Sequence, residues 1–567
     1  METKRAWSLR KIAAVVIALI VLLVCLFSGL AAVGLLGPDE PRYAWIARAM
    51  AHNGNWITPL LYGAPWFEKP ILYYWTAALG FKLVPSPEWA ARLPSAFAAL
   101  VAALATAWLG WKRYGERTGW AILLIFPTCV AVIAFARAAA PDMLFTASLA
   151  LALVCAASAL EKHGLFLAAG KNARNTPLGS GAPSDKSALI FLGVSLGFAT
   201  LAKGPAALIL SGGSVLLWAI ATRHVKEAMR LLHPLAILSF CIIALPWYIL
   251  CAYFNPSFFR TFILQHNFQR YLTPVFQHRQ PFWFFGPIAL LGLLPWTALL
   301  IGATLDGRRI FRDGSWRKSF GFFIACWAAF PLIFFSFSQS KLPEYILPIF
   351  PPLILLLAHS YVCAIEQAPR TAQWLGVATG TMWAILGIAG AFGFQKLPPY
   401  EAPYANGLHK LAVAAILIGV FTGVAVECLS LARHAWHALA LTSLVCAGLV
   451  IAAGAQILPE LDPLLSTRPL AHEIQHLLSP DQQTSGSHLF SVGEVNRNCD
   501  YGLRFYLGPD RITQLTPQGV GEGFVLLSSD GDMTLNNLGI IHRKIVAKFL
   551  PYCWVESLPA QEVPEDK

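Results

Sequence analysis

The side chains best suited to chemistry gather in one short stretch of this sequence, directly after a long apolar run. Charged residues make up only 13% of the 567-residue chain, yet several lie between Gly34 and Trp75. Ionisable groups at a membrane usually face a polar cavity with partners, because burying them in lipid is costly. We therefore expect a functional loop whose charged residues are Asp39, Glu40, Arg42, Arg48, Glu68 and Lys69.

The first motif of this loop is Asp39-Glu40-Pro41-Arg42-Tyr43. A carboxylate at Asp39 can act as a general base that removes a proton from an acceptor hydroxyl. The alternative is that Asp39 only caps a short helix by accepting backbone N–H bonds. Arg42 can hold a phosphate by a forked contact, or it can pair with the neighbouring acid.

The second motif is Phe67-Glu68-Lys69-Pro70. Glu68 can bind a divalent cation and Lys69 a phosphate oxygen, or the two can form a plain interfacial charge pair. Farther along, His266 and Arg270 would share one face of a helix, being four residues apart. A lone histidine is usually a hydrogen-bonding residue, but imidazole beside an acidic loop also suits zinc-like ions.

Further charges are dispersed along the chain. Arg137 and Asp142 flank Pro141 and are expected to pair structurally, and Lys203 precedes a Gly-Pro turn. Each of these could be an ordinary charge that reaches from a span edge to water. Taken together, the cations at one bilayer depth fit an anionic lipid head group such as a phosphate. The set includes Arg42, Lys69, Lys203, Arg270 and Lys341, with Tyr345 close by in sequence.

The elements that must position these residues are membrane helices. The chain is 56% hydrophobic, and many apolar runs reach the roughly 20 residues that cross a bilayer. We predict an all-α polytopic protein with about thirteen spans, the first over residues 12–33. Much of the +12 net charge lies in short loops, which is the positive-inside pattern and argues against nucleic-acid binding. An odd span number places the C-terminus outside.

Two domains are expected. Residues 1–458 would form the membrane catalytic domain, with residues 34–75 as an outer loop containing short helices over 41–50 and 70–83. Residues 459–567 alternate short apolar runs with polar turns, which predicts a small soluble α/β domain. Whether Cys499 and Cys553 of this tail pair is left open.

Five motifs in this order carry a resemblance to a known family: DEPRYAWIARAM, GNWITPLLYGAPWFEKPILYYW, LAKGP, QHNFQRY and SKLPEYILPIFPP. The chain resembles the bacterial aminoarabinose transferase and protein mannosyltransferase superfamily, which has the GT-C membrane fold. The resemblance covers about residues 10 to 365 and implies sugar transfer from a polyprenyl-phosphate carrier on the periplasmic side of the inner membrane.

The resemblance also implies roles for individual residues. Asp39 matches the catalytic base, and Glu68 with His266 matches a metal site, with zinc as the ion. Departures occur at Pro41, where the aminoarabinose branch often has Thr, and at Gln265, which replaces a usual Glu; they would alter sugar or acceptor choice. The predicted substrate- and phosphate-binding set is Arg42, Tyr43, Lys69, Arg137, Asp142, Lys203, Arg270, Lys341 and Tyr345.

The expected function is transfer of 4-amino-4-deoxy-L-arabinose to lipid A by a monomeric enzyme. Within the same class, the alternative is a mannose-type transferase that acts on protein or another envelope glycolipid. From other classes, the alternatives are a polyprenyl-phosphate lipid transporter or flippase and a non-enzymatic scaffold. The sequence shows no Gly/Pro-interrupted span pair of the kind that inverted-repeat transporters carry.

Overall fold

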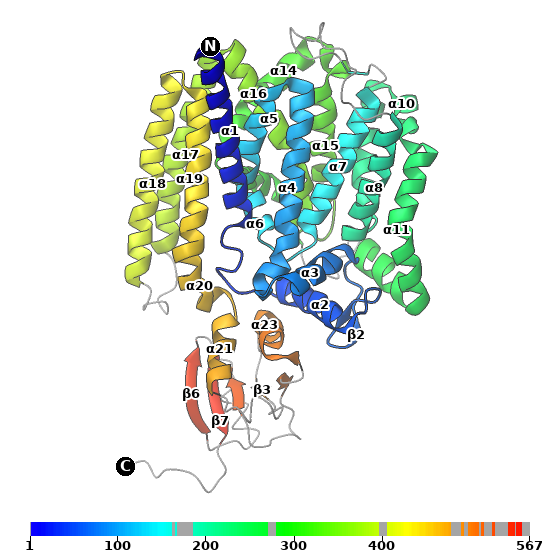
Figure 1. Cartoon of the computed structure of the whole chain (residues 1–567), viewed down its shortest axis with the longest axis vertical. Helices are drawn as coiled ribbons and strands as arrows, with labels where there is room; N and C mark the ends of the chain where they lie inside the picture. Colours follow the sequence, from blue (N-terminus) through cyan, green and yellow to red (C-terminus); the bar gives the residue numbers. More distant parts are fainter. Residues whose placement is uncertain are drawn as a thin grey trace.

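The computed structural model consists of an upright bundle of helices with smaller elements beneath one end (Figure 1). The N-terminus lies at the upper end, and the loop elements α2 and α3 lie at the lower end above the C-terminal tail. The structure describes residues 2–161, 165–166, 185–269, 279–395, 405–477, 489–492, 497–509, 512–514, 524–527, 543–549 and 552–557.

The bundle is all helical, as its long apolar runs predict. Its helices pack mainly against sequence neighbours, and the α17–α18 hairpin and the α7–α8 pair make extensive contacts. The bundle helices are α1 (Glu2–Phe27), α4 (Pro87–Tyr114), α5 (Glu116–Ile125), α6 (Val130–Ala136), α7 (Asp142–Glu161), α8 (Asp185–Lys203), α9 (Ala206–Thr222), α11 (Pro234–Phe254), α13 (Phe285–Gly292), α14 (Leu300–Arg312), α15 (Phe320–Ser336), α16 (Phe350–Gln367), α17 (Pro369–Gln395), α18 (Ala405–Leu431) and α19 (Ala435–Ala452).

Eight helices among the described residues are long and apolar enough to cross a membrane, or ten if each of two bent helix pairs is one span. The bent pairs turn by 62° at residues 128–130 and by 108° at residues 292–296. Three shorter apolar helices begin at Lys11, Ala206 and Phe320. The chain is thus a multi-pass helical membrane protein, and the count of thirteen spans stays a prediction.

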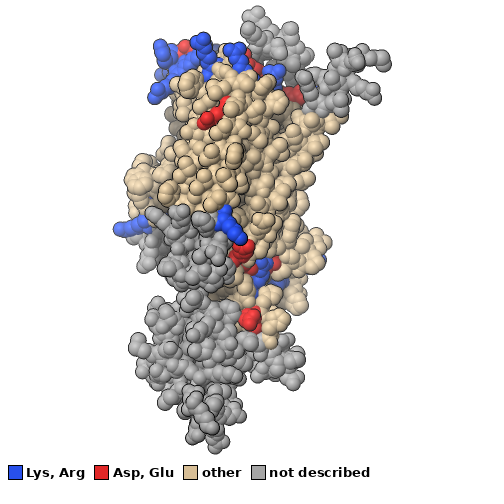
Figure 2. Space-filling view, turned by 90° about the vertical axis from the view of Figure 1, so that its left-hand side faces the viewer, with Lys and Arg blue, Asp and Glu red and all other residues tan. Residues whose placement is uncertain are grey.

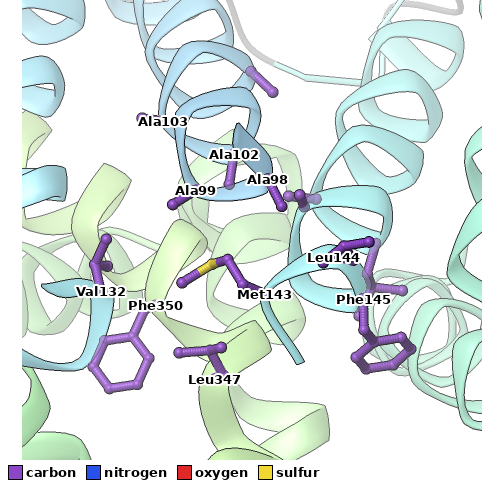
Figure 3. Packing of buried hydrophobic residues seen from close by; sticks show 14 of the residues in the cluster. Ala98, Ala99, Ala102, Ala103, Val132, Met143, Leu144, Phe145, Leu347 and Phe350 are labelled. Carbon is purple, nitrogen blue, oxygen red and sulfur yellow. The ribbon is translucent and has the colours of Figure 1, made fainter. Parts of the chain in front are cut away.

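Small residues bring the central helices close together. Ala98, Ala99 and Ala102 of α4 are buried in one cluster with Met143 of α7 and Phe350 of α16 (Figure 3). In a membrane, helix association depends on such close packing, because lipid tails are as apolar as the side chains themselves. The packed centre fixes the lower ends of α4 and α7, which carry charged residues of the candidate site.

Charge is distributed unevenly along the bundle. Lys and Arg gather at the end where the N-terminus lies, above a broad band with few charged side chains (Figure 2). The positive-inside rule associates such an end with the cytoplasm. Basic residues close the last turns of α4 and α14, at Lys112, Arg113, Arg309 and Arg312.

The first helix ends earlier than predicted. The sequence predicts a span to Val33, but α1 ends at Phe27 and Gly29 adopts φ +71°, which side-chain-bearing residues rarely adopt. A Cβ at Gly29 would lie 3.1 Å from the Cα of Gly454, so the two backbones approach closely there. The segment after α1 is therefore irregular and leads directly into the loop.

The loop contains both short helices that the sequence predicts. They are α2 (Asp39–Asn53) and α3 (Leu72–Leu83), within a residue or two of the predicted starts. Between them lies a small hairpin, β1 (Leu60–Leu61) and β2 (Ala64–Pro65), which the sequence analysis did not predict. Tyr62 at its turn has φ +51°, so its ring projects from a tight bend.

The tail begins with α20 (Leu458–Leu465) and α21 (Arg468–Leu477), followed later by α23 (Arg497–Leu507). Its described strands form one sheet in the order β4-β3-β5-β7-β6. β3 runs parallel to β4 and β5, whereas β7 runs antiparallel to β5 and β6. The strands are β3 (Leu489–Val492), β4 (Ile512–Gln514), β5 (Phe524–Leu527), β6 (Arg543–Phe549) and β7 (Tyr552–Ser557), and two of them fall on the apolar runs of the sequence.

Candidate active site

Asp39 is the first residue of α2 and remains partly open to solvent. Its side chain is 54% exposed and forms an ion pair with Arg42 three residues later. No side chain caps the N-terminus of α2, where Pro38 occupies the cap position. The carboxylate is therefore held on one side by a guanidinium and is accessible on the other, as a general base must be.

Arg42 is nearly buried between two acids. Its Nη1 lies 3.3 Å from Oε2 of Glu68, and its Nε donates to the carbonyl of Pro38 at 3.0 Å. Burial alone would lower the pKa of Arg42, but Glu68, Tyr43 and Asp39 together raise it above its ordinary value. Arg42 is a permanent cation at the edge of the loop.

Glu68 lies beside two cations among the described side chains. Besides Arg42, its Oε1 lies 3.4 Å from Nζ of Lys69. Among the described residues, no group of three His, Cys, Asp or Glu side chains could hold a metal ion. The predicted partner His266 lies on the π-helix Arg260–Gln269, but its imidazole is outside the described side chains. The described residues alone do not make up a metal site.

A second charged cluster lies at the ends of α7 and α8. Lys203 forms an ion pair with Asp142, and its Nζ lies 5.1 Å from the centroid of the Tyr345 ring. The expected pair between Arg137 and Asp142 is wrong, because Asp142 pairs with Lys203 and Arg137 binds backbone carbonyls. Lys203 is largely buried rather than a solvated tip, with a side chain 14% exposed.

Glu344 connects the two clusters. Its carboxylate interacts electrostatically with Asp142 and Lys203 of the bundle and with Lys69 of the loop. The acid precedes Tyr345 at the start of the 3-10 helix η8 (Pro343–Ile349). The structure thus brings Lys69, Lys203 and Tyr345 to one region at the lower end of the bundle.

Three members of the predicted substrate-binding set are engaged by other groups of the protein, and their role at the substrate stays a prediction. Tyr43 is buried against the rings of Tyr73 and Tyr74, and burial raises its pKa well above the ordinary value. Nζ of Lys341 donates to the carbonyls of Gln280 at 3.0 Å and Ser338 at 2.7 Å. The third is Arg137, whose guanidinium donates to the backbone carbonyl of Cys25. Arg270, which also belongs to the predicted set, lies outside the described residues.

A buried ion pair that the sequence did not predict holds the start of α2. Arg92 of α4 lies 2.7 Å from Oε2 of Glu40, and both side chains are almost fully buried. Glu40 also accepts the backbone N–H groups of Leu36 at 2.7 Å and Ala139 at 2.6 Å. Buried charges need such full pairing. The signal in the sequence was an arginine within the first turns of an apolar helix.

Three arginines bind the carbonyls of the irregular segment after α1. Arg92 donates to Leu30, Val33 and Gly34, at 2.6 to 2.8 Å. Arg137 donates to Cys25 at 2.5 Å and Ser28 at 3.0 Å, and Arg468 of the tail donates to Ala31 at 2.9 Å and Ala32 at 3.2 Å. These bonds satisfy carbonyls that a helix end leaves free, and they position the segment that leads to Asp39.

Sequence comparison finds relatives that match most of this chain. Residues 12–262 match the family described as Dolichyl-phosphate-mannose-protein mannosyltransferase. The chain is 33% identical over 426 residues to the undecaprenyl phosphate-alpha-4-amino-4-deoxy-L-arabinose arabinosyl transferase of Erwinia tasmaniensis, across 74% of this chain and 72% of that protein. The protein of the same name from Edwardsiella ictaluri is 33% identical over 407 residues, across 70% of this chain and 69% of that one.

A solved structure shares the whole fold. The crystal structure of ArnT from Cupriavidus metallidurans bound to undecaprenyl phosphate superposes with a TM-score of 0.78 at 21% identity, covering 98% of this chain and 99% of that one. The apo structure of the same protein gives a TM-score of 0.75. From the sequence relatives and the motifs of the loop, the chain belongs to the family of undecaprenyl phosphate-α-4-amino-4-deoxy-L-arabinose arabinosyl transferases.

Proposed function

We propose that this protein transfers 4-amino-4-deoxy-L-arabinose from undecaprenyl phosphate to an envelope acceptor such as lipid A. Family membership makes it a glycosyltransferase, and the names of its relatives specify that lipid-linked aminoarabinose. One observation carries the proposal. A half-exposed carboxylate, Asp39, pairs with Arg42, and Glu68 lies beside both Arg42 and Lys69, so that acids and two cations of the loop lie together.

The chemistry assigns one role to each part of the cluster. Asp39 orients the acceptor oxygen and accepts its proton as that oxygen attacks the anomeric carbon of the sugar. The bond between this carbon and the carrier phosphate oxygen breaks, and the phosphate keeps the electron pair. The cations Arg42, Lys69, Lys203 and Arg270 stabilise the charge that develops there, and one well-placed donor of this kind contributes about 10²- to 10³-fold in rate.

The proposal includes an orientation. Residues 1–458 form the catalytic membrane domain with thirteen spans in the bacterial inner membrane. The loop at residues 34–75 and the tail at 459–567, an α/β domain, lie on the periplasmic side, and the enzyme acts as a monomer. The basic upper end supports this orientation. A reporter fused after Lys567 should be active only when it is exported, and a cytoplasmic tail would contradict the span count.

Zinc is a separate proposal. We propose that Glu68 and His266 bind a divalent ion, with zinc as the expected metal. The support is the donor chemistry of a carboxylate with an imidazole. Glu68 lies beside Arg42 and Lys69 in this structure. None of the catalytic steps described above uses a metal ion.

The central test is turnover of labelled undecaprenyl-phosphate aminoarabinose by the purified full chain. Asp39→Asn should bind the carrier normally and lose most of the sugar transfer, because the amide cannot accept the proton. Glu366→Gln is the control, since this acid forms an exposed pair with Arg117 away from the loop. Full turnover by Asp39→Asn would show that the catalytic assignment is wrong.

The same assay separates the alternatives. A transporter or flippase would bind the carrier and release no sugar, and a scaffold would show no loss of binding in Lys203→Ala. A mannose-type transferase has some support from the family match over residues 12–262. Mass spectrometry of envelope lipids, with and without the protein, identifies the sugar and the acceptor.

A further inference from the structure

The tail helix α23 is docked on the loop by strong polar contacts. Arg48 of α2 donates from Nη2 to the carbonyl of Phe505 at 2.6 Å, and its guanidinium lies 4.2 Å from the centroid of that ring. The hydroxyl of Tyr506 accepts from the backbone N–H of Leu35 and donates to Glu88, both at 2.9 Å. These contacts dock α23 on α2 and its surroundings, and none of them involves Tyr501.

Tyr501 extends from this docked helix to Arg42. The Arg42 guanidinium carbon lies 5.2 Å from the centroid of the Tyr501 ring and 5.4 Å from that of Trp66. The Tyr501 ring stacks on Tyr62 of the β1–β2 turn at 6.4 Å, with 21° between the planes. A residue near the C-terminus therefore contacts a cation at the edge of the candidate site.

The contact matters because Arg42 also lies between two acids. Asp39 and Glu68 both attract its N–H groups, and these are the groups that a phosphate would need. An aromatic ring attracts a guanidinium through its face and leaves the N–H edges free. The rings of Tyr501 and Trp66 thus hold the Arg42 guanidinium without themselves using its hydrogen-bond donors, which lie on Asp39, Glu68 and the Pro38 carbonyl in this structure.

We propose that Tyr501 is a positioning residue that holds Arg42 for the phosphate of the lipid carrier, so that the tail helix is part of the donor site. This inference rests on the proposed function, in which Arg42 lies at that phosphate. It assigns to the tail a role in substrate binding that no motif of its sequence indicates.

The test uses the full-length protein and undecaprenyl phosphate as the probe. Tyr501→Phe keeps the ring and should bind the lipid as the unaltered protein does. Tyr501→Leu keeps apolar volume without a ring and should weaken binding about 3- to 30-fold, the range of one desolvated cation–π contact. KM for the lipid-linked sugar should rise by the same factor, with kcat nearly unchanged. If Tyr501→Leu fails to fold, Tyr501→Met takes its place.

A double-mutant cycle identifies the path of the effect. If Tyr501 acts through Arg42, then Tyr501→Leu should add little to the loss that Arg42→Lys causes alone. Tyr506→Phe is the docking control, because it removes a contact of α23 away from Arg42. This variant should lower the melting temperature and leave the affinity for undecaprenyl phosphate nearly unchanged.

Two results overturn the inference. One is equal lipid affinity of Tyr501→Leu and the unaltered protein. The other is an equal loss of lipid affinity from Tyr501→Leu whether residue 42 is arginine or, as in Arg42→Lys, lysine. The effect would then come from the docking of α23 alone. If the unaltered protein binds no undecaprenyl phosphate, the proposed function itself fails, and this outcome is distinct from either of the others.

Discussion

Asp39 and Glu40 are neighbouring carboxylates that should respond in opposite ways to the same substitution. Asp39 is half exposed and, among the described residues, forms an ion pair with Arg42. Glu40 is buried, forms an ion pair with Arg92 at 2.7 Å and accepts two backbone N–H groups. Glu40→Gln removes the carboxylate that lies 2.7 Å from Arg92 and leaves Glu88 as a weaker interaction. Asp39→Asn leaves Arg42 with its second acid, Glu68.

The expected magnitudes follow from burial. Breaking a buried ion pair by neutralising one partner costs about 3–5 kcal/mol, whereas an exposed pair contributes about 1 kcal/mol or less. Glu40→Gln should therefore lower the free energy of unfolding by about 3–5 kcal/mol, and Asp39→Asn by about 1 kcal/mol at most. Catalysis should show the reverse order, because only Asp39 is placed to meet an acceptor.

The assay pairs thermal unfolding in detergent with turnover of the lipid-linked sugar, normalised to the folded fraction. Glu40→Gln should melt at a clearly lower temperature while its folded fraction retains turnover. Asp39→Asn should melt near the unaltered protein and lose turnover. If Glu40→Gln melts like the unaltered protein and its folded fraction is inactive, the structural assignment of Glu40 is refuted.

Three further predictions concern the remaining charges. Lys203→Gln should weaken binding of undecaprenyl phosphate about 10- to 100-fold, the range of one charge-assisted hydrogen bond. Lys341→Gln should change this affinity little, because Nζ of Lys341 already binds two backbone carbonyls. Arg137→Gln should lower the free energy of unfolding by about 1–3 kcal/mol, because the Arg137 guanidinium binds the carbonyls of Cys25 and Ser28. Its affinity for undecaprenyl phosphate should not change. A loss of affinity at unchanged stability would contradict this structural role. Elemental analysis should find zinc that is lost in Glu68→Ala and in His266→Ala, and metal-free protein with full turnover would disprove the site.

The sequence predicted the helical architecture and the two loop helices well, because both depend on local patterns. Apolar runs of membrane length and the proline near the start of α2 are visible without a structure. The loop motif Asp39 to Arg42 was likewise recognisable, since these residues are close in the chain.

Long-range partners were not predictable in the same way. The expected Arg137–Asp142 pair was inferred from nearness in sequence, but α8 brings Lys203 to Asp142 instead. Glu40 and Arg92 were missed because they lie on separate helices and no local spacing connects them. Tyr501 is one of several aromatic residues in a tail without motifs, and only the docking of α23 reveals its contact with Arg42.

The carbonyls that follow α1 depend on arginines from three distant parts of the chain. Arg468 is synthesised after Arg92, Arg137 and the bundle helices α1 to α19, so the segment that precedes Asp39 gains its third arginine only when those helices have been made. We expect a growing chain that stops before Arg468 to insert its helices while this segment stays loosely held.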